Sequence, residues 1–415
     1  MGGIVAANAI LIVGSFVMDN AFSAGASVME TSPPSRIERS STAHRVEAWN
    51  EWDPLEEVVV GRVDGACFSP TEPGYRADIR DPALARTIPW PRGPKHPRVI
   101  DAANRQLDRL AAVLEAEGVS VRRPVPIKWD QPLRTPTFEV ENMYCTGCPR
   151  DVMITIGHEV IEATMSRRAR YFEHLAYRPI VYELFNSDPR MAWTSAPKPT
   201  MGDGMYRTEF WDYSDEERHA RMHDFEFAVA QDEVVFDAAD ITRFGRDLFV
   251  QESMTTNRPG IAWLKRHLEP RGLRVHPVHF PYDLFPSHID CTFVPLCPGL
   301  VLTNPERPIL ESEAALFKAN GWRFVDAPQP VSTNDEMPAF CQSSKWLAMN
   351  LLSLSPDTVV VEAGEKPLIA MMKALGFHVI DLPFRDVFEF GGSLHCATWD
   401  VRRRGSLESY FHSLD

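Results

Sequence analysis

The chain lacks the features that mark several large classes of protein. Cysteine is sparse, with 7 in 415 residues. That is too few for a disulfide scaffold, and the odd count favours free thiols in a reducing, cytoplasmic setting. Positive charge is in deficit, because 43 Lys and Arg stand against 57 Asp and Glu and leave a formal charge of −14. This balance argues against a nucleic-acid or anionic-membrane partner and is compatible with a cationic substrate.

Several motifs for cofactors and metals are also missing. The sequence has no GxGxxG, no Walker A loop, no HExxH and no HxE of a zinc deaminase. Cys145 and Cys148 form a CxxC, but no second pair has zinc-ribbon spacing. We therefore expect no metal and no organic cofactor, with a structural zinc at Cys145 and Cys148 as the weaker alternative.

The apolar run at residues 4–17 is short for a membrane span and has no Lys or Arg before it. A cleaved signal or an anchor is thus less favoured than a disordered extension. A linker-like stretch follows at residues 31–45. We predict an extension over residues 1–45 and a single domain over 46–415. Hydrophobic residues are 44% and charged residues 24% of the chain, which suits a sizeable core.

One pattern recurs after residue 50: an apolar strand, an amphipathic helix that ends at Gly, and another strand. In the first copy Leu107, Leu110, Ala111 and Leu114 have helical spacing, and Gly118 is the expected stop. Strands are expected at residues 56–62, 151–157, 247–251, 299–304 and 358–363, with a less regular helix near 169–185. Periodicity favours equally a repeat around an axis and ordinary doubly wound α/β alternation.

Two segments place carboxylates and a histidine where they could act on a ligand. Asp237 follows the apolar strand EVVF and precedes small residues, although a turn or N-cap role would also explain it. In an extended strand, His288 and Asp290 would project from the same face. Such a pair suits proton transfer or cation binding, and a purely structural pair is the alternative.

Two further segments could supply a nucleophile and an anion site. Gly391 and Gly392 precede His395 and Cys396 and allow a backbone path that exposes a thiol. A buried structural cysteine is the alternative. Ser343 and Ser344 open the helix SSKWLAMNLL, where N-capping and binding of a carboxylate ligand are compatible.

At these residues the sequence resembles the amidinotransferases, the group that contains arginine:glycine amidinotransferase and its bacterial relatives. The resemblance runs over roughly residues 50–411. It rests on the stretches NEWDPLEEVVVGR, CPRDVMITIGHEVIEATMSRRARYFE, APKPTM, FDAADITRFGRDLF, HIDCTF, NPERP, SSKWLAMN and GGSLHCATWDVRRRG. It implies an α/β fold, a five-bladed propeller of pseudo-fivefold symmetry, and a homodimer by family habit.

By the same resemblance, each motif implies a role for its residues. Cys396 is the expected nucleophile, His288 the acid/base and Asp237 the supporting carboxylate. Asp151 and Asp290 are expected to grip the guanidinium of arginine. The amino-acid end of arginine is expected to bind the side chains of Arg307, Ser343 and Ser344.

The acceptor amine is less well determined. Phe285 and Ser287, in FPSHID, differ from the vertebrate glycine enzyme and look more like the cylindrospermopsin and saxitoxin pathway amidinotransferases. Residues 280–287 are predicted to gate the acceptor site. Glycine is the leading acceptor. Lysine, an aminocyclitol phosphate or an alkaloid precursor are alternatives, as are a guanidine hydrolase of the arginine deiminase kind and an inactive binding subunit.

Overall fold

The computed structural model describes residues 44–76, 91–281, 288–331 and 344–412. Residues from His44 onward form one compact unit. The predicted boundary between an extension and a domain at residues 45 and 46 stays a prediction. Within the described ranges, no helix combines the length and the hydropathy needed to cross a membrane.

The described residues contain five three-stranded sheets that repeat one plan. An inner strand pairs antiparallel with a middle strand, and the middle strand pairs parallel with an outer strand. In order from inner to outer strand, the sheets are β17 (Thr398–Arg403), β1 (Leu55–Val60) and β2 (Ser120–Arg122); β5 (Met153–Ile156), β6 (Glu159–Glu162) and β7 (Ala192–Ser195); β8 (Ile241–Phe244), β9 (Asp247–Gln251) and β10 (Arg274–Val278); β11 (Phe293–Cys297), β12 (Leu300–Thr303) and β13 (Arg323–Asp326); and β14 (Leu352–Ser355), β15 (Thr358–Glu362) and β16 (His378–Leu382).

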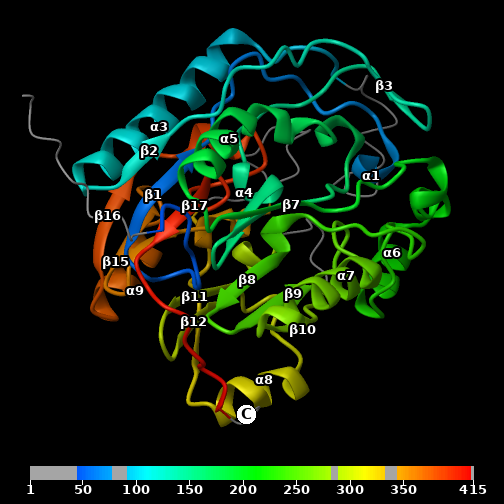
Figure 1. The fold of residues 1–415 in the computed structure, drawn as a ribbon. Helices are drawn as coiled ribbons and strands as arrows, with labels where there is room; N and C mark the ends of the chain where they lie inside the picture. The colour runs from blue at the N-terminus through cyan, green and yellow to red at the C-terminus, as the bar shows by residue number, and fades with distance from the viewer. Residues whose placement is uncertain (1–43, 77–90, 282–287, 332–343, 413–415) are drawn as a thin grey trace, which may run out of the picture. The chain divides into compact units, whose positions relative to one another are not determined.

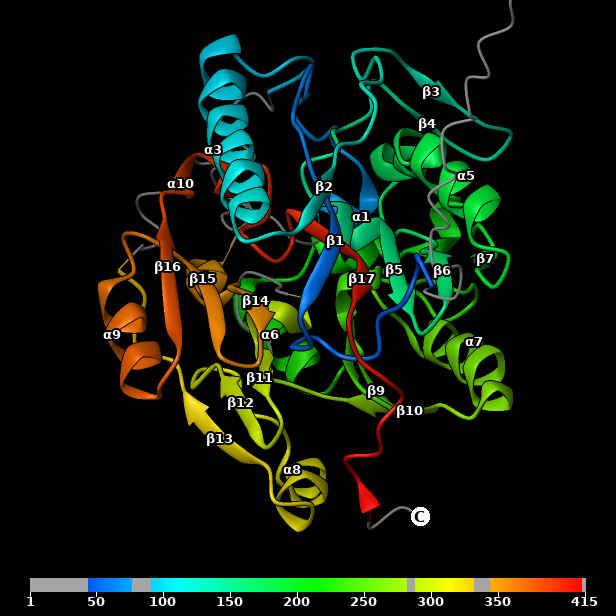
Figure 2. The same ribbon diagram turned by 60° about the vertical axis from the view of Figure 1, so that its left-hand side comes forward.

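A helix joins the middle and outer strands of each sheet. These helices are α3 (Pro97–Ala116), α5 (Arg178–Ser187), α7 (Arg258–Leu268), α8 (Glu311–Ala319) and α9 (Lys366–Ala374). They lie outside their sheets (Figure 2). Such a strand–helix–strand crossover is the usual link between parallel strands.

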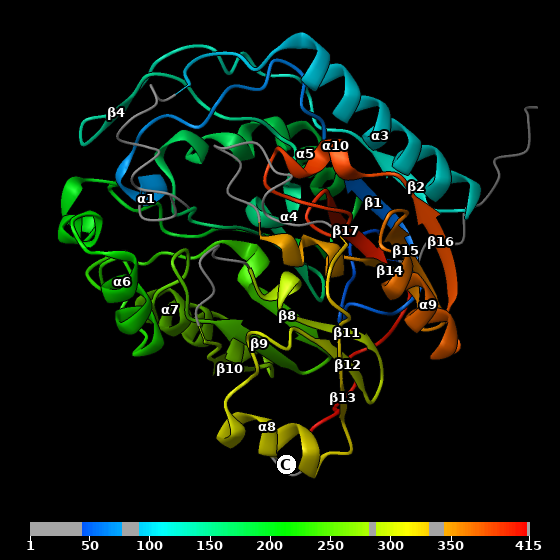
Figure 3. The ribbon, with the colours of Figure 1, turned by 180° about the vertical axis from the view of Figure 1, so that it is seen from behind.

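The ring of sheets closes with the two ends of the folded unit. The last strand, β17, pairs with the first, β1, and the two are drawn side by side in red and blue (Figure 1). Seen from behind, β8, β11, β14 and β17 lie toward the middle, and α3, α7, α8 and α9 lie farther out (Figure 3). This is the five-bladed α/β propeller that the resemblance implied, so the repeat is confirmed over the doubly wound alternative.

Helix periodicity and the glycine stops were predicted well. Leu107, Leu110 and Leu114 are buried on α3, whereas Ala111 is half-buried. Each glycine that ends a predicted helix has positive φ, as an αL stop requires: 85° at Gly118, 84° at Gly272, 79° at Gly321 and 97° at Gly376.

The less regular helix predicted near 169–185 consists of the 3-10 turns η1 (Arg168–Arg170) and η2 (Glu173–Ala176), followed by α5. Three other local predictions were wrong. The stretch EVVF is not a strand, and Asp237 precedes the 3-10 turn η5 (Ala238–Asp240). His288 is the N-cap of the 3-10 turn η7 (Ile289–Cys291) and Asp290 lies within that turn, so neither is in a strand. After Ser344 the helix is a single 3-10 turn, η9 (Lys345–Met349).

Shorter elements lie between the blades or, for α1 and η6, within one blade. They are α1 (Pro73–Arg76), α4 (Pro149–Val152), α6 (Asp215–His223), α10 (Arg385–Phe388), the hairpin of β3 (Leu133–Arg134) and β4 (Glu139–Val140), and the 3-10 turns η3 (Asp203–Met205), η4 (Thr208–Trp211) and η6 (Glu269–Arg271). Apolar clusters fill the space between sheets and helices.

Candidate active site

Each blade contributes to one cluster from the turn that precedes its inner strand. Asp151 lies in α4 before β5, Asp237 precedes η5 and β8, and His288 opens η7 before β11. Asn350 lies between η9 and β14 and contacts Cys396, and Cys396 comes just before β17. Because the blades repeat around one axis, equivalent turns meet at one end of that axis. Repetition of the fold therefore gathers residues that are far apart in the sequence.

His288 lies between two carboxylates. Its Nδ1 is 3.6 Å from Asp151 Oδ1, and its Nε2 is 3.4 Å from Asp237 Oδ2. Burial opposes the charged imidazole, but Asp151, Asp237 and Asp240 outweigh it and raise the pKa of His288 well above 6.5. The neighbouring carboxylates therefore favour the protonated imidazole, whose side chain is 18% exposed.

Both carboxylates are held by groups outside the histidine. Asp237 Oδ1 accepts a hydrogen bond of 2.9 Å from the backbone N–H of Ser166. Burial would raise the pKa of Asp237, but the bond to His288 and the positive charges nearby lower it. Asp151 Oδ2 accepts a bond of 2.5 Å from Arg170, whereas Asp151 Oδ1 has no hydrogen-bond partner among the described residues. A buried carboxylate oxygen without a donor suits a ligand that brings N–H groups.

Cys396 is a buried free thiol beside the third carboxylate. Its Sγ donates to Asp290 Oδ2 at 3.3 Å, and its backbone N–H donates to Asn350 Oδ1 at 3.0 Å. The thiol of Cys291 lowers the pKa of Cys396, but burial and the charges of Asp290 and Asp151 outweigh it, so this pKa is raised. A cation bound between these carboxylates would remove that opposition and favour the thiolate.

The glycine pair before Cys396 is required by space and by conformation. Gly391 has φ of 86° in open surroundings. A Cβ on Gly392 would lie 2.5 Å from Cys148 Sγ and 2.6 Å from Cys396 Cβ. A side chain there would overlap Cys148 Sγ and Cys396 Cβ, so the loop needs glycine at this position. The expectation that the loop exposes the thiol was wrong, because Cys396 is 2% exposed.

The predicted carboxylate-binding residues are only partly described. Ser344 is buried, and its hydroxyl caps η9 by accepting from the N–H of Trp346 at 3.1 Å. Arg307 is buried close to the η7 turn, where its Nε donates to the carbonyl of Pro281 at 2.7 Å. Ser343, Phe285 and Ser287 lie outside the described residues, so their predicted roles stay predictions.

Sequence reasoning gave no role to three residues that hold the site together. Arg170 binds both Asp151 and Glu173, the latter through Nε at 2.6 Å. His395 Nδ1 lies 2.8 Å from Asp290 Oδ2. Asn350 donates to the carbonyl of Asp290 and accepts from Cys396. Their sequence signal was weak, since isolated Arg, His and Asn residues have no spacing rule that links them across blades.

A cluster of buried charges also went unnoticed. Asp400 is fully buried and binds Arg150, Arg243 and Arg403 at 2.7, 2.5 and 2.8 Å. Glu51 binds Arg243 at 2.6 Å and lies 3.5 Å from His395 Nε2. The chain Asp290–His395–Glu51 therefore connects the site to this charge cluster.

The CxxC cysteines do not gain further ligands. Cys145 Sγ accepts from the N–H of Gly147, and Cys148 Sγ donates to the carbonyl of Phe390 at 3.7 Å. Among the described residues, the group with metal-ligand spacing is Asp290, Cys291 and Cys396, whose ligand atoms lie within 4.8 Å of one another. It includes neither CxxC thiol, so the zinc alternative at Cys145 and Cys148 gains no support.

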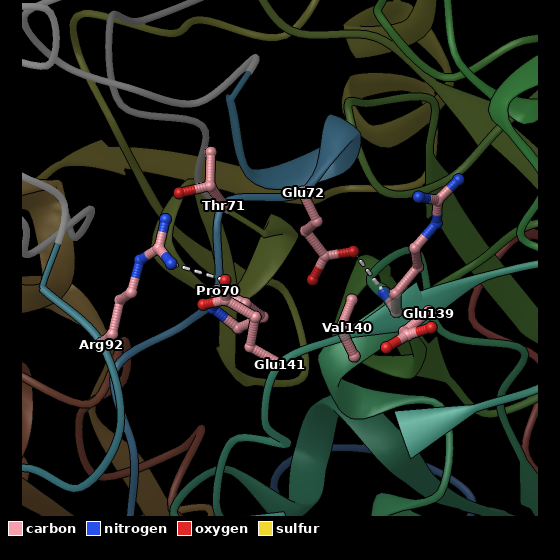
Figure 4. Close-up of a pocket in the computed structure, with 8 residues that line it drawn as sticks. Pro70, Thr71, Glu72, Arg92, Glu139, Val140 and Glu141 are labelled. Atoms are coloured by element: carbon pink, nitrogen blue, oxygen red, sulfur yellow. Dashed lines mark hydrogen bonds and ion pairs between the residues drawn. The ribbon is translucent and has the colours of Figure 1, made fainter. Parts of the chain in front are cut away.

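A separate cavity of about 270 Å³ holds none of the predicted residues (Figure 4). Its lining is Pro70, Thr71, Glu72, Arg92, Glu139, Val140, Glu141 and Arg168. Its charged groups already have partners within the protein. Glu72 accepts from the backbone N–H groups of Arg168 and Ala169, and Arg92 pairs with Glu141 at 2.6 Å. We therefore assign it no ligand.

Comparison with known proteins identifies the family. The chain is 42% identical over 368 residues to the mitochondrial glycine amidinotransferase of Danio rerio, covering 88% of this chain and 84% of the relative. It is 40% identical over 371 residues to the L-arginine:L-lysine amidinotransferase of Pseudomonas savastanoi pv. phaseolicola, with 88% and 96% covered. No protein-family model matches the chain.

Solved structures agree. SxtG, an amidinotransferase of the saxitoxin biosynthetic pathway from Microseira wollei, matches with a TM-score of 0.77 at 38% identity, over 88% of this chain and all (100%) of that one. The inosamine-phosphate amidinotransferase of Streptomyces griseus matches with a TM-score of 0.77 at 35% identity, over 88% and 99%. A likeness to a dimethylarginine dimethylaminohydrolase, at 14% identity and a TM-score of 0.50, is one of fold alone. The chain belongs to the amidinotransferases, enzymes that transfer amidino groups.

Proposed function

We propose that this enzyme takes the amidino group of L-arginine onto Cys396 and passes it to an amine, with glycine as the leading acceptor. The observation that carries the proposal is the placement of one buried thiol among the carboxylates of Asp151, Asp237 and Asp290. A guanidinium is planar and cationic, and carboxylates along its edges bind it in a fixed orientation.

The first half-reaction follows from that geometry. Asp151 and Asp290 hold the guanidinium plane so that Cys396 Sγ approaches the central carbon from above it. The bound positive charge offsets the carboxylates that otherwise raise the pKa of Cys396, so substrate favours the thiolate. Sulfur attacks and gives a tetrahedral adduct. His288 protonates the nitrogen of the leaving ornithine, because an amide anion would be a poor leaving group.

The second half-reaction runs through the same groups in reverse. The covalent amidino-Cys396 is attacked by the acceptor amine, and His288, now neutral, accepts the amine's proton. The guanidino product then leaves and the thiol is restored. Asp237 holds the imidazole ring throughout, since its other oxygen is fixed by the N–H of Ser166. Glycine as acceptor gives guanidinoacetate and L-ornithine.

Support for glycine comes from the vertebrate relative, a glycine amidinotransferase that the chain resembles at 42% identity. The other relatives act on lysine, on an inosamine phosphate or in saxitoxin biosynthesis according to their names, and each resembles this chain at 35–40% identity. Lysine, an aminocyclitol phosphate and an alkaloid precursor therefore remain the acceptors to test beside glycine.

A test incubates the enzyme with arginine alone and measures ornithine and intact mass. We expect a stoichiometric burst of ornithine and the mass of one amidino group on Cys396, both absent in Cys396→Ser. Adding each amine in turn should discharge the adduct only for the true acceptor. Citrulline as the main product would refute transfer in favour of hydrolysis, and an unmodified Cys396 would refute the covalent route.

Domain boundaries, assembly and location stay part of the proposal. We propose an extension over residues 1–45 before a catalytic domain over 46–415, a homodimer, and a cytoplasmic enzyme. The vertebrate relatives are named mitochondrial, so location needs its own measurement. Native mass spectrometry tests the dimer, and fractionation of the source cells tests the location.

A further inference from the structure

A second buried thiol lies beside Cys396 and has no part in the proposed mechanism. Cys291 ends the turn η7 and is 3% exposed. The sulfur atoms of Cys291 and Cys396 and an oxygen of Asp290 all lie within 4.8 Å of one another.

The two thiols share the residues that hold them. Cys291 Sγ donates to Asp290 Oδ1 at 3.6 Å, and Cys396 Sγ donates to Asp290 Oδ2 at 3.3 Å. Asn350 donates through Nδ2 to Cys291 Sγ at 3.4 Å and accepts through Oδ1 from the N–H of Cys396 at 3.0 Å. The pair therefore forms one unit that spans two blades.

We propose that Cys291 and Cys396 form a modification site, in which a peroxide converts the two thiols into a reversible intramolecular disulfide. A disulfide needs its sulfurs at about 2.05 Å. Rotation of the two side chains about their Cα–Cβ bonds can supply the approach, at the cost of their hydrogen bonds to Asp290 and Asn350. Because those bonds favour the reduced pair, we expect a thiol reductant to reopen the disulfide readily.

The reaction balances with the peroxide as the two-electron oxidant. The thiolate of Cys396 attacks one peroxide oxygen, an S–O bond forms as the O–O bond breaks, and hydroxide leaves and takes up a proton. Cys291 sulfur then attacks Cys396 sulfur, the S–O bond breaks, and water leaves with the Cys291 proton. Two thiols and one hydrogen peroxide thus give one disulfide and two waters.

The two thiols have distinct roles in this scheme. The hydrogen bond to Cys396, burial and the charge of Asp290 raise the pKa of Cys291 well above its usual range, so Cys291 stays protonated. For Cys396 the same contact opposes burial and the charges of Asp290 and Asp151, so the pKa of Cys396 is raised less far than that of Cys291. Cys396 is therefore the thiol that meets the peroxide, and Cys291 is the one that resolves the sulfenic acid.

Cys148 provides a matched control. It is also a buried free thiol close to Cys396, because a Cβ on Gly392 would lie 2.5 Å from Cys148 Sγ and 3.5 Å from Cys396 Sγ. Its thiol donates to the carbonyl of Phe390 at 3.7 Å. We expect Cys148 to stay out of the disulfide, so Cys148→Ala and Cys291→Ala should behave oppositely.

The experiment treats the full-length enzyme with hydrogen peroxide and reads mass and activity separately. In the wild type we expect a loss of about 2 Da, a cross-linked peptide containing Cys291 and Cys396, and recovery of at least about half the untreated activity after dithiothreitol. Cys148→Ala should match it. Cys291→Ala, and the closer replacement Cys291→Ser, should show no cross-link and about 32 Da of oxygen on Cys396. They should regain less than about a tenth of their own untreated activity.

The loss of activity rests on the proposed role of Cys396, whereas the disulfide does not. A cross-link without loss of activity would therefore refute the proposed role of Cys396 as the nucleophile but support the disulfide between Cys291 and Cys396. The inference fails if wild-type Cys396 gains oxygen without cross-linking, if it cross-links to Cys148, or if Cys291→Ala recovers as fully as the wild type.

Discussion

Replacing Asp400 by Asn tests the charge cluster beneath the site. Asp400 is fully buried and binds three arginines, two of which also contact Glu51. Arg403 depends on Asp400 most, because Arg403 also donates to the backbone carbonyls of Asp53 and Ser353, which carry no charge. Asn keeps the shape but removes the charge and points an N–H₂ group at guanidinium donors. Leaving a buried charge unpaired costs about 3–5 kcal/mol, which is the expected loss in free energy of unfolding.

Equilibrium urea unfolding followed by tryptophan fluorescence measures this loss, since Trp399 is buried beside Asp400. The control is Arg404→Gln: Arg404 is 70% exposed and lies 3.6 Å from Glu56, so we expect a change below about 1 kcal/mol. Burial would raise the pKa of Asp400, but the three arginines outweigh it and hold this pKa well below 3.8. The contribution of Asp400 to the free energy of unfolding is therefore complete above pH 3.8 and is lost only in stronger acid. An Asp400→Asn loss near that of the control at neutral pH would refute the reasoning.

Three further predictions concern the site. Asp237→Asn removes a charge that raises the pKa of His288, so the alkaline fall of kcat/KM for arginine should move to lower pH. The activity loss should therefore be larger in alkaline than in mildly acidic buffer, and a loss equal at every pH would contradict this. Arg170→Lys keeps the positive charge but loses the forked guanidinium that holds Asp151 and Glu173. Steady-state kinetics should show kcat/KM for arginine lower by about tenfold or more, whereas unchanged kinetics would exclude a positioning role for Arg170. Gly392→Ala should lower the free energy of unfolding in urea by about 1–3 kcal/mol and abolish ornithine release, because the new Cβ would overlap Cys148 and Cys396. Normal turnover would show that the loop can shift to accommodate the methyl group.

Local patterns predicted the parts of this protein that depend on neighbours in sequence. The spacing of Leu107, Leu110 and Leu114 predicted the buried face of α3, and the glycine stops matched positive φ values. The motif order identified the family, which comparison with known proteins confirmed. Local patterns failed where short apolar stretches were assigned to strands. Around Asp237 and His288, tertiary contacts fix 3-10 turns, such as the bond from Ser166 to Asp237, that no local periodicity signals.

The sequence by itself determined which side chains are available: one thiol after a glycine pair, a histidine, and carboxylates in separate motifs. Only the tertiary structure decided that they meet, because closure of the blades by β1 and β17 brings five distant turns to one end of an axis. It also decided what surrounds them: Arg170 on Asp151, Asn350 and Cys291 beside Cys396, and Asp400 among three arginines. Contacts between residues far apart in the chain depend on packing geometry, which composition and spacing do not encode.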